Sequence, residues 1–511
     1  MKRICYTLGL LIGVLSSAWA QNRVVVNADL AKDTISRHIY GHFAEHLGRC
    51  IYGGFYVGED SDIPNTNGMR NDVVAALKKM GVPNLRWPGG CFADTYHWKD
   101  GIGPKEDRPS MINIFWGGTT EDNSFGTHEF MELCQQLGAE PFINGNLGSG
   151  TVQEMVEWVE YLNHPGGAPM AKLRSENGRE QPWNVQFFGI GNENWGCGGD
   201  MTAEYYADVY KRYNNYIRDY GGPRLFRLPS TANSADYHWT ETLMKNVPLH
   251  TMSGLGFHHY SVINWSDKGS ATNFSTEEYF QTMEKALQME ELIQRHGAIM
   301  DRYDPKKRLA MVVDEWGGWY DVEPGTNPGF LYQQNTMRDA MIAGATLNIF
   351  NNHADRVRLA NIAQTVNVLQ AVALTDGNKM LLTPTYHVFE MYNVHHDALM
   401  LPLTVETANF ELNGRALPAV SASASKDQSG KIHITLTNID PTKKQEVPIN
   451  LRGMKASKVS GRVLASGKIQ DYNTFDQPNK VQPTEFKGAK LKGETLTVSM
   501  PPASVVVLEL Q

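Results

Sequence analysis

The feature that most constrains the fold is an alternation of short apolar runs with amphipathic helical patterns from residue 34 to 397. The helical pattern is clear in DVVAALKKMG, where Val73, Val74, Leu77 and Met80 share one face before the stop signal Gly81. The runs that predict strands are HIYGHF (38–43), NLRW (84–87), PFING (141–145), VQFFGIG (185–191), RLFRLPS (224–230), GLGFHHY (254–260), LAMVVDEW (309–316) and TLNIFNN (346–352). This α/β alternation predicts a (β/α)8 TIM barrel. An open doubly wound sheet is the alternative, but no G-x-G-x-x-G motif follows the first run.

A different pattern begins near residue 398. Short β-rich runs separated by Gly, Asp, Asn, Lys and Pro follow one another, among them AVSASASKD, KIHITLTNI, KQEVPINLRG and SVVVLELQ. Such regular short strands with turn signals predict a β-sandwich. The run RVVVNADL near the N-terminus predicts one more strand, which we expect to join this sandwich.

The N-terminus has the pattern of a secretory signal peptide. Lys2 and Arg3 precede an apolar run over about 8–15 and the small-x-small triplet Ala18-Trp19-Ala20. The sequence therefore predicts cleavage before Gln21 and export, to the periplasm or to the outside of the cell. The apolar run is shorter than the roughly 20 residues that span a bilayer, so we expect no membrane span. The alternative is an N-terminal strand of the fold.

Charge and cysteine usage exclude several classes of protein. The formal net charge is −8 and no Lys/Arg-rich run is present, so nucleic acid is not an expected partner. Beyond the predicted signal peptide, Cys50, Cys91, Cys134 and Cys197 are widely spaced and form no C-x-x-C pair. We therefore expect no structural zinc site and mostly free thiols.

Polar side chains follow the predicted strands, where a barrel carries its functional residues. They are Glu45, Arg86, Asn192, Glu193, His259, Tyr260, Asp314, Glu315, Asn351, Asn352 and His353. Glu193 ends the fourth run and Glu315 ends the seventh. Two glutamates can cleave a glycosidic bond, because one holds a proton for the leaving oxygen while the other stays ionised. This chemistry needs no metal and no cofactor.

Tryptophans near the strand ends suit the same chemistry, because the C–H faces of sugars pack on indole rings. They are Trp98, Trp116, Trp195, Trp316 and Trp319. A competing motif is HFAEH, His42 to His46, which matches the zinc-binding pattern H-x-x-E-H. That pattern requires a helix, whereas here it follows a β-like run and is closed by Gly48. A zinc site is therefore the weaker interpretation.

Several motifs together resemble the family 51 glycoside hydrolases, the α-L-arabinofuranosidases, from about residue 36 to the C-terminus. These motifs are GHFAEHLGRCIYGG, LRWPGGCFADTYHWKDGIGP, GIGNENWG, HHY, VDEWGGWY and ANIAQTVNVLQ. The resemblance implies a barrel with a jelly-roll-like C-terminal sandwich. It also implies release of terminal arabinofuranose with retention of configuration, from arabinan, arabinoxylan or derived oligosaccharides. Relatives are often hexamers, so a homo-oligomer is a further expectation.

The resemblance assigns roles residue by residue. Glu193 matches the acid/base and Glu315 the nucleophile, and Asn192 would bond the 2-hydroxyl of the sugar. Glu45 would bind the sugar hydroxyls, and Arg86 would keep the nucleophile ionised. The further pocket residues that match are Cys91, Trp116, Tyr260, Trp319 and Gln364.

These expectations divide the chain into a signal peptide (1–20), an N-terminal strand that joins the sandwich (21–33), a catalytic barrel (34–397) and a β-sandwich (398–511). Two other functions remain open from the sequence. One is an endo-acting β-glycanase, because such enzymes belong to the same clan of glycoside hydrolases and carry both glutamates at the same strand positions. The other is a non-catalytic carbohydrate-binding barrel, although the presence of both Glu193 and Glu315 argues against it.

Overall fold

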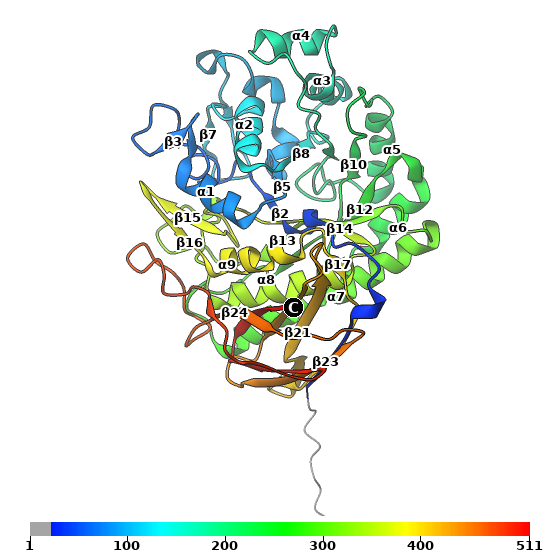
Figure 1. Cartoon of the computed structure of the whole chain (residues 1–511). Coiled ribbons are helices and arrows are strands. Elements are labelled where there is room, and N and C mark those ends of the chain that lie inside the picture. Colours follow the sequence, from blue (N-terminus) through cyan, green and yellow to red (C-terminus); the bar gives the residue numbers. More distant parts are fainter. Residues whose placement is uncertain (1–21) are drawn as a thin grey trace, which may run out of the picture.

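The computed structural model describes residues 22–511, in which a parallel sheet curls into a barrel above a β-sandwich (Figure 1). The barrel strands are β2 (Gly41–Phe43), β5 (Asn84–Trp87), β8 (Glu140–Gly145), β9 (Phe187–Ile190), β10 (Phe226–Pro229), β11 (Ala232–Asn233), β12 (Gly254–Ser261), β13 (Ala310–Gly318) and β14 (Val357–Ile362). Only Ser230 and Thr231 separate β10, which pairs with β9, from β11, which pairs with β12. These two short segments act as one strand that closes an eight-membered ring. The predicted TIM barrel is confirmed.

Helices cover the outside of this barrel. They are α1 (Asn71–Met80), α2 (Thr127–Leu137), α3 (Val152–Asn163), α4 (Pro169–Glu176), α5 (Ala203–Asn214), α6 (Tyr237–Asn246), α7 (Thr276–Tyr303), α8 (Met337–Asn352) and α9 (Pro384–Tyr392). Helix α1 ends at Gly81, whose φ of 79° is left-handed, as its sequence predicts. Helix α7 begins with a capping box in which Ser275 and Glu278 satisfy each other's backbone N–H groups.

The predicted eighth strand, 346–352, is wrong. Those residues form the end of α8, and the eighth strand is β14, which begins eleven residues after the start of that run. Every residue of α8 from Met337 to Asn351 is buried, so its sequence shows no polar face that would mark it as a helix. Asn351, Asn352 and His353 are consequently not on the rim of the barrel; Asn351 instead donates to Ser423 Oγ at 3.0 Å.

The C-terminal sandwich consists of two sheets. The first has the order β18 (Leu403–Glu406), β1 (Arg23–Asn27), β23 (Gln445–Arg452), β27 (Thr495–Met500), β26 (Ala489–Lys492). The second has the order β17 (Leu399–Met400), β21 (Val420–Lys426), β22 (Ile432–Asn438), β28 (Ser504–Leu510), β24 (Val459–Ala465), β25 (Thr484–Glu485). Strand β1, from the start of the described chain, thus lies inside the C-terminal sheet, antiparallel to β18 and parallel to β23.

Helices α8 and α9 lie between the barrel and the second sheet of the sandwich (Figure 1). Strand β21 alternates Ala and Ser, and its Ala422 and Ala424 enter the apolar core between the two sheets. Its serines face the other way, so that Ser423 donates to Asn348 Oδ1 on α8 at 2.9 Å. Both faces of the strand are buried. The alanines suit the apolar core between the sheets, and the serines supply the hydrogen bonds that the polar side chains of α8 require.

The predicted signal peptide, 1–20, lies outside the described residues. From residue 22 onward, no helix is both long enough and apolar enough to cross a bilayer.

Candidate active site

The carboxyl ends of the barrel strands surround a cavity of about 490 Å³. Eight of the ten residues that the sequence singles out as catalytic or substrate-binding line this cavity: Glu45, Cys91, Trp116, Glu193, Tyr260, Glu315, Trp319 and Gln364. The other two, Arg86 and Asn192, are buried behind it and bond to one another. The topology therefore brings together residues that are spread over more than half of the chain.

Glu45 is fixed by four hydrogen-bond donors. Its Oε1 accepts from the backbone N–H groups of Gly90, at 3.0 Å, and Phe92, at 3.3 Å, and from Trp116 Nε1 at 2.9 Å. Its Oε2 accepts from Gln364 Nε2 at 2.6 Å. Burial, followed by the charge of Glu315, raises the pKa of Glu45 to about 7, while the donors favour its ionised form.

Glu315 lies near the end of β13, with a partner on each oxygen. Arg86 Nη1 donates to Oε2 at 3.1 Å, and the Tyr260 hydroxyl donates to Oε1 at 2.7 Å. Arg86 Nη2 also donates to Asn192 Oδ1 at 2.6 Å, so one guanidinium positions two residues of the site. A carboxylate held by a buried guanidinium remains ionised and can act as a nucleophile.

Glu193 follows β9 in a left-handed backbone conformation, with a φ of 42°, which is uncommon for a residue other than glycine. Burial, and then the charge of Glu315, raises the pKa of Glu193 above its ordinary value. Carboxylate oxygens of Glu193 and Glu315 lie within 4.8 Å of one another. The pair thus holds one carboxyl group that favours its proton beside one that is ion-paired, which is the division of roles that glycoside cleavage requires.

His258 lies between the two glutamates, and it is not among the site residues predicted from the sequence. Its Nδ1 lies 2.8 Å from Glu193 Oε1 and 3.6 Å from Glu315 Oε2, and its Nε2 lies 3.2 Å from Asp314 Oδ1. Burial disfavours its charged form, but the charges of Glu315 and Asp314 and the hydrogen bonds outweigh burial and raise its pKa to about 10. The sequence does contain a signal for His258. Residues two positions apart on a strand point to the same side, and His258 precedes the predicted pocket residue Tyr260 by two positions on β12.

Asp94 is a second site residue that was not predicted from the sequence, and it fixes the loop that carries Glu193. Its carboxylate accepts from the backbone N–H groups of Leu147 and Gly148, each at 2.7 Å, and of Asn192 at 2.9 Å. Asp94 lies in a 3-10 helix, Cys91–Thr95, directly after the run RWPGG. A carboxylate that only positions backbone N–H groups of other loops has no sequence pattern that would mark it as part of the site.

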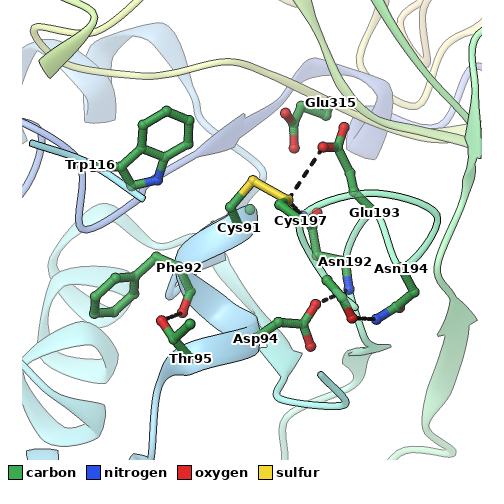
Figure 2. The surroundings of a disulfide bond; sticks show 12 residues. Cys91, Phe92, Asp94, Thr95, Trp116, Asn192, Glu193, Asn194, Cys197 and Glu315 are labelled. Carbon is green, nitrogen blue, oxygen red and sulfur yellow. Dashed lines mark hydrogen bonds between the residues drawn. A yellow bond between two sulfur atoms is a disulfide. The ribbon is translucent and has the colours of Figure 1, made fainter. Parts of the chain in front are cut away.

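A disulfide bond joins Cys91 to Cys197 beside the catalytic pair (Figure 2). Cys197 Sγ lies 3.6 Å from Glu193 Oε2, and Trp116 and Glu315 lie around the same bridge. The expectation of free thiols is confirmed for the buried Cys50 and Cys134 and is wrong for this pair. The two cysteines are 106 residues apart, and only the barrel topology brings their Cα atoms to 5.5 Å.

The other residues that the sequence singles out lie partly in the cavity and partly in the core. Trp195 and Trp319 line the cavity with Trp116, whereas Trp98 and Trp316 are buried in the core. His259 also lines the cavity, but it bonds neither glutamate: its Nδ1 lies 3.1 Å from Ser234 Oγ, and its Nε2 donates to the Lys285 carbonyl at 2.8 Å. The HFAEH motif is not helical, since His42 lies in β2 and Glu45 follows it in a loop.

Two clusters among residues 22–511 bring three potential metal ligands within 4.8 Å, and both include Glu193. One consists of Cys91, Glu193 and Cys197, but its sulfurs are joined to each other and are not thiolates. The other consists of Glu193, His258 and Glu315, and its histidine carries a proton that a cation would have to displace. The residues present therefore suit proton transfer and nucleophilic attack better than metal binding.

A (β/α)8 barrel with a glutamate of raised pKa after its fourth strand and an arginine-paired glutamate at the end of its seventh is typical of a glycoside hydrolase. Comparisons with known proteins agree. The model of the α-L-arabinofuranosidase 1 domain matches residues 76–241, and that of the α-L-arabinofuranosidase C-terminal domain matches residues 314–504. An intracellular exo-α-L-arabinofuranosidase of Bacteroides ovatus is 53% identical over 100% of this chain and 99% of its own length.

Solved structures show the same relationship. The family 51 arabinofuranosidase of Xanthomonas axonopodis pv. citri is 48% identical with a TM-score of 0.95, over 96% of this chain and 100% of that one. The α-L-arabinofuranosidase of Thermotoga maritima, in an arabinose complex, is 31% identical with a TM-score of 0.84, over 96% of this chain and 99% of that one. The chain belongs to glycoside hydrolase family 51, the α-L-arabinofuranosidases. This assignment replaces the endo-β-glycanase and the non-catalytic barrel as interpretations of the sequence.

The predicted export is wrong by the same comparison. The Bacteroides ovatus relative matches this chain over its whole length and is named intracellular, which contradicts the signal peptide and the periplasmic or secreted location. The prediction depended on two basic residues, a short apolar run and a small-x-small triplet. Such a pattern is a local composition signal, and the named relative overrules it.

Proposed function

We propose that this chain removes terminal α-L-arabinofuranose from arabinose-containing saccharides by a retaining mechanism, with Glu315 as nucleophile and Glu193 as acid/base. The observation that carries the proposal is the environment of the two carboxyl groups. Glu315 is bonded to Arg86 and Tyr260, whereas burial raises the pKa of Glu193. Their oxygens approach within 4.8 Å, which supports the short separation of retaining pairs, about 5–5.5 Å, and leaves little room for a water between them.

The reaction then follows in two steps. Glu315 attacks the anomeric carbon and forms a covalent arabinosyl-enzyme, while Glu193 donates its proton to the departing oxygen. Glu193, now ionised, removes a proton from water, which attacks the anomeric carbon and releases arabinose with retained configuration. His258 lies beside whichever glutamate is ionised: Glu315 before the attack, and Glu193 once Glu315 carries the arabinosyl group.

The remaining predicted residues form the site for the sugar. Glu45, held by Trp116 and Gln364, would accept hydrogen bonds from the sugar hydroxyls, and Asn192 would bond the 2-hydroxyl. All these residues lie between 34 and 397, so we retain that segment as the catalytic barrel and 398–511, with 21–33, as the sandwich. The substrates would be arabinan, arabinoxylan or derived oligosaccharides, and a homo-oligomer, which light scattering would detect, remains a prediction.

Two alanine variants, assayed with a nitrophenyl arabinofuranoside, test the roles. Glu193→Ala should still form the intermediate, because nitrophenolate leaves without a proton, but should hydrolyse it about 10²–10⁴-fold more slowly. Added azide should accelerate this variant and give an arabinosyl azide of retained configuration. Glu315→Ala should be nearly inactive, and any azide product should be inverted.

The exposed Glu204→Ala on α5 is the matched control and should behave as the wild type. Azide rescue with the opposite stereochemistry in the two variants would reverse the roles. Inverted arabinose from the wild type would reject the retaining mechanism.

A further inference from the structure

The disulfide bond between Cys91 and Cys197 has no role in the mechanism above, although it lies directly beside the general acid (Figure 2). Cys197 Sγ is 3.6 Å from Glu193 Oε2, and Asn192 Nδ2 approaches the same sulfur at 3.9 Å. Both sulfurs and a carboxylate oxygen of Glu193 lie within 4.8 Å of one another. Three atoms that can each bind a metal ion thus lie together, and a covalent bond between two of them prevents them from doing so.

Solvent reaches this cluster. Cys91, Cys197 and Glu193 are all partly exposed, and Cys91 and Glu193 line the catalytic cavity. A disulfide bond that is open to solvent can be attacked by a small reductant. Cys50 and Cys134, by contrast, are buried. Among residues 22–511, the bridge is therefore the cysteine pair that a reductant or a cation in the cavity can reach.

Reduction would turn both sulfurs into metal ligands with little movement of the chain. In a tetrahedral zinc site, a sulfur and an oxygen ligand lie about 3.6 Å apart and two sulfurs about 3.8 Å apart. The distance from Cys197 Sγ to Glu193 Oε2 already has the first value. The sulfurs still have to separate, and rotation of the two side chains achieves this because the Cα atoms are 5.5 Å apart.

The carboxyl group of Glu193 turns its free oxygen toward the sulfurs. His258 Nδ1 donates to Oε1 at 2.8 Å, so Oε2 is the oxygen that carries the proton for the departing sugar oxygen. Within residues 22–511, Oε2 makes no hydrogen bond to any residue other than Cys197. A cation bound to Oε2 would replace the catalytic proton, so metal binding and general acid catalysis exclude each other. This step rests on the acid/base role proposed above for Glu193.

We propose that reduction of the Cys91–Cys197 bridge creates a binding site for a soft divalent cation such as zinc. The ligands are the two thiolates and Glu193 Oε2, with water in the fourth position. Thiolate ligands favour zinc over magnesium and calcium, which bind oxygen. The intact bridge therefore protects the general acid from such cations, and its loss makes the enzyme sensitive to them.

The chemistry of the two steps is balanced. A phosphine supplies two electrons, the S–S bond breaks, and water gives its oxygen to the phosphine and one proton to each sulfur. The cation then displaces both thiol protons and the proton of Glu193, and all three protons pass to the solvent.

Cadmium, which binds thiolates as zinc does, tests the site directly, because cadmium–thiolate bonds absorb in the ultraviolet. The full chain, reduced with a phosphine, should bind one equivalent of cadmium, and zinc should displace it, whereas the oxidised chain should show no absorption band. Cys197→Ser and Glu193→Gln, each treated in the same way, should bind cadmium at least about tenfold more weakly. Cys134→Ala is the matched control, because it removes a buried thiol on α2 and should bind as the wild type does.

Activity on methyl α-L-arabinofuranoside, whose leaving group requires a proton, tests the consequence. Zinc at ten times its dissociation constant should lower kcat/KM of the reduced enzyme about tenfold, and EDTA should restore it. The oxidised enzyme should lose less than about a tenth of its activity at the same zinc concentration.

A bridge that resists reduction in the folded chain, or a reduced chain without the absorption band, would overturn the site. Equal cadmium affinity in the reduced wild type and in Glu193→Gln would do the same. A band that requires Glu193, together with full activity in zinc, would support the site and reject Glu193 as the acid. An oxidised wild type that hydrolyses no arabinofuranoside would reject the proposed function, while cadmium binding would still decide the site.

Discussion

His258 places a positive charge between the carboxyl groups that perform the reaction. Its two nitrogens face Glu193 and Asp314, and its pKa of about 10 means that it stays protonated across the neutral range. Asp314 complements it, because Arg86 and His258 outweigh the effect of burial and lower the Asp314 pKa to about 2. The site thus contains a fixed cation that stabilises the ionised forms of both glutamates.

Replacing His258 should therefore shift the pH dependence of the enzyme. In His258→Gln the cation is lost, so ionisation of Glu193 becomes less favourable and its pKa rises further. The basic limb of the profile of kcat/KM against pH, which reports the acid Glu193, should move to higher pH, by about one unit or more given the strength of charge interactions at such distances. His259→Gln is the matched control, because the pKa of His259 is lowered to about 4 and its loss removes no charge. A shift to lower pH, or the same shift in both variants, would contradict the role of His258.

The sequence predicts residues that do chemistry better than residues that hold them. Glu193 and Glu315 follow from the need for two carboxyl groups at strand ends, and family motifs supply the sugar-binding residues. Asp94 and His258 lie within the motifs LRWPGGCFADTYHWKDGIGP and HHY, but their role is to bond other site residues, and the motifs alone do not show this role. Gly89 belongs to the motif LRWPGGCFADTYHWKDGIGP, but the sequence does not show why a glycine is needed there. In the folded barrel a Cβ at this position would lie 2.6 Å from Glu45 Cγ.

At the scale of elements, the disulfide connects the two loops that surround the catalytic pair. Cys91 begins the 3-10 helix that contains Asp94, and Cys197 lies in the loop after Glu193 (Figure 2). The same loop has other attachments, since Asn192 N–H donates to Asp94 and Asn194 N–H donates to Ser230 Oγ at 3.1 Å. The bridge therefore adds to an arrangement that hydrogen bonds already define.

Loss of the bridge should affect stability more than activity. A crosslink over 106 residues restricts the unfolded chain, and its removal typically costs about 2–4 kcal/mol in the free energy of unfolding. We expect Cys91→Ala with Cys197→Ala to unfold at lower urea concentration, while kcat/KM falls less than about tenfold because the hydrogen bonds persist. Reductant should reproduce the effect in the wild type and add nothing in the double variant. An inactive double variant with wild-type stability would show that the bridge itself positions Glu193.

Element prediction from sequence worked where one face of a helix meets water. Helix α1, Asn71–Met80, ends before the predicted stop Gly81 and buries Val73, Leu77 and Met80, because its apolar and polar faces alternate with helical period. Helix α8 was read as a strand because it is covered on one side by the barrel and on the other by the sandwich. Burial on all sides removes the periodicity that distinguishes the two structures.

At the scale of the whole molecule, a buried polar layer joins the barrel to the sandwich. Asn348 Oδ1 on α8 accepts from Ser423 Oγ, at 2.9 Å, and from Thr435 Oγ1, at 2.8 Å. On the neighbouring turn of the helix, Asn351 donates to the same Ser423. Such a layer is specific, because Asn348 and Asn351 on α8 and Ser423 and Thr435 in the sandwich are all buried and each has a partner across the boundary.

Removing one member should destabilise the entire chain. Asn348→Ala leaves buried hydroxyl groups without their acceptor and should lower the free energy of unfolding by about 1–3 kcal/mol. Asn450→Ala, an exposed asparagine on β23 of the same sandwich, should change it by less than about 0.5 kcal/mol. Urea unfolding followed by tryptophan fluorescence provides the measurement, and equal effects of the two substitutions would argue against a coupling role for the layer.

Strand β1 also has a consequence for how the chain is made. Its neighbour Asn22 donates to Gln445, 423 residues later, and β1 pairs with β23. At roughly 5–20 residues per second, a ribosome needs about 20–85 s to synthesise the intervening chain. During that time the valines of β1 have no sheet to join, and every strand of the barrel leaves the ribosome first. Strand β1, the first strand of the described residues to be translated, is thus among the last to find its partners.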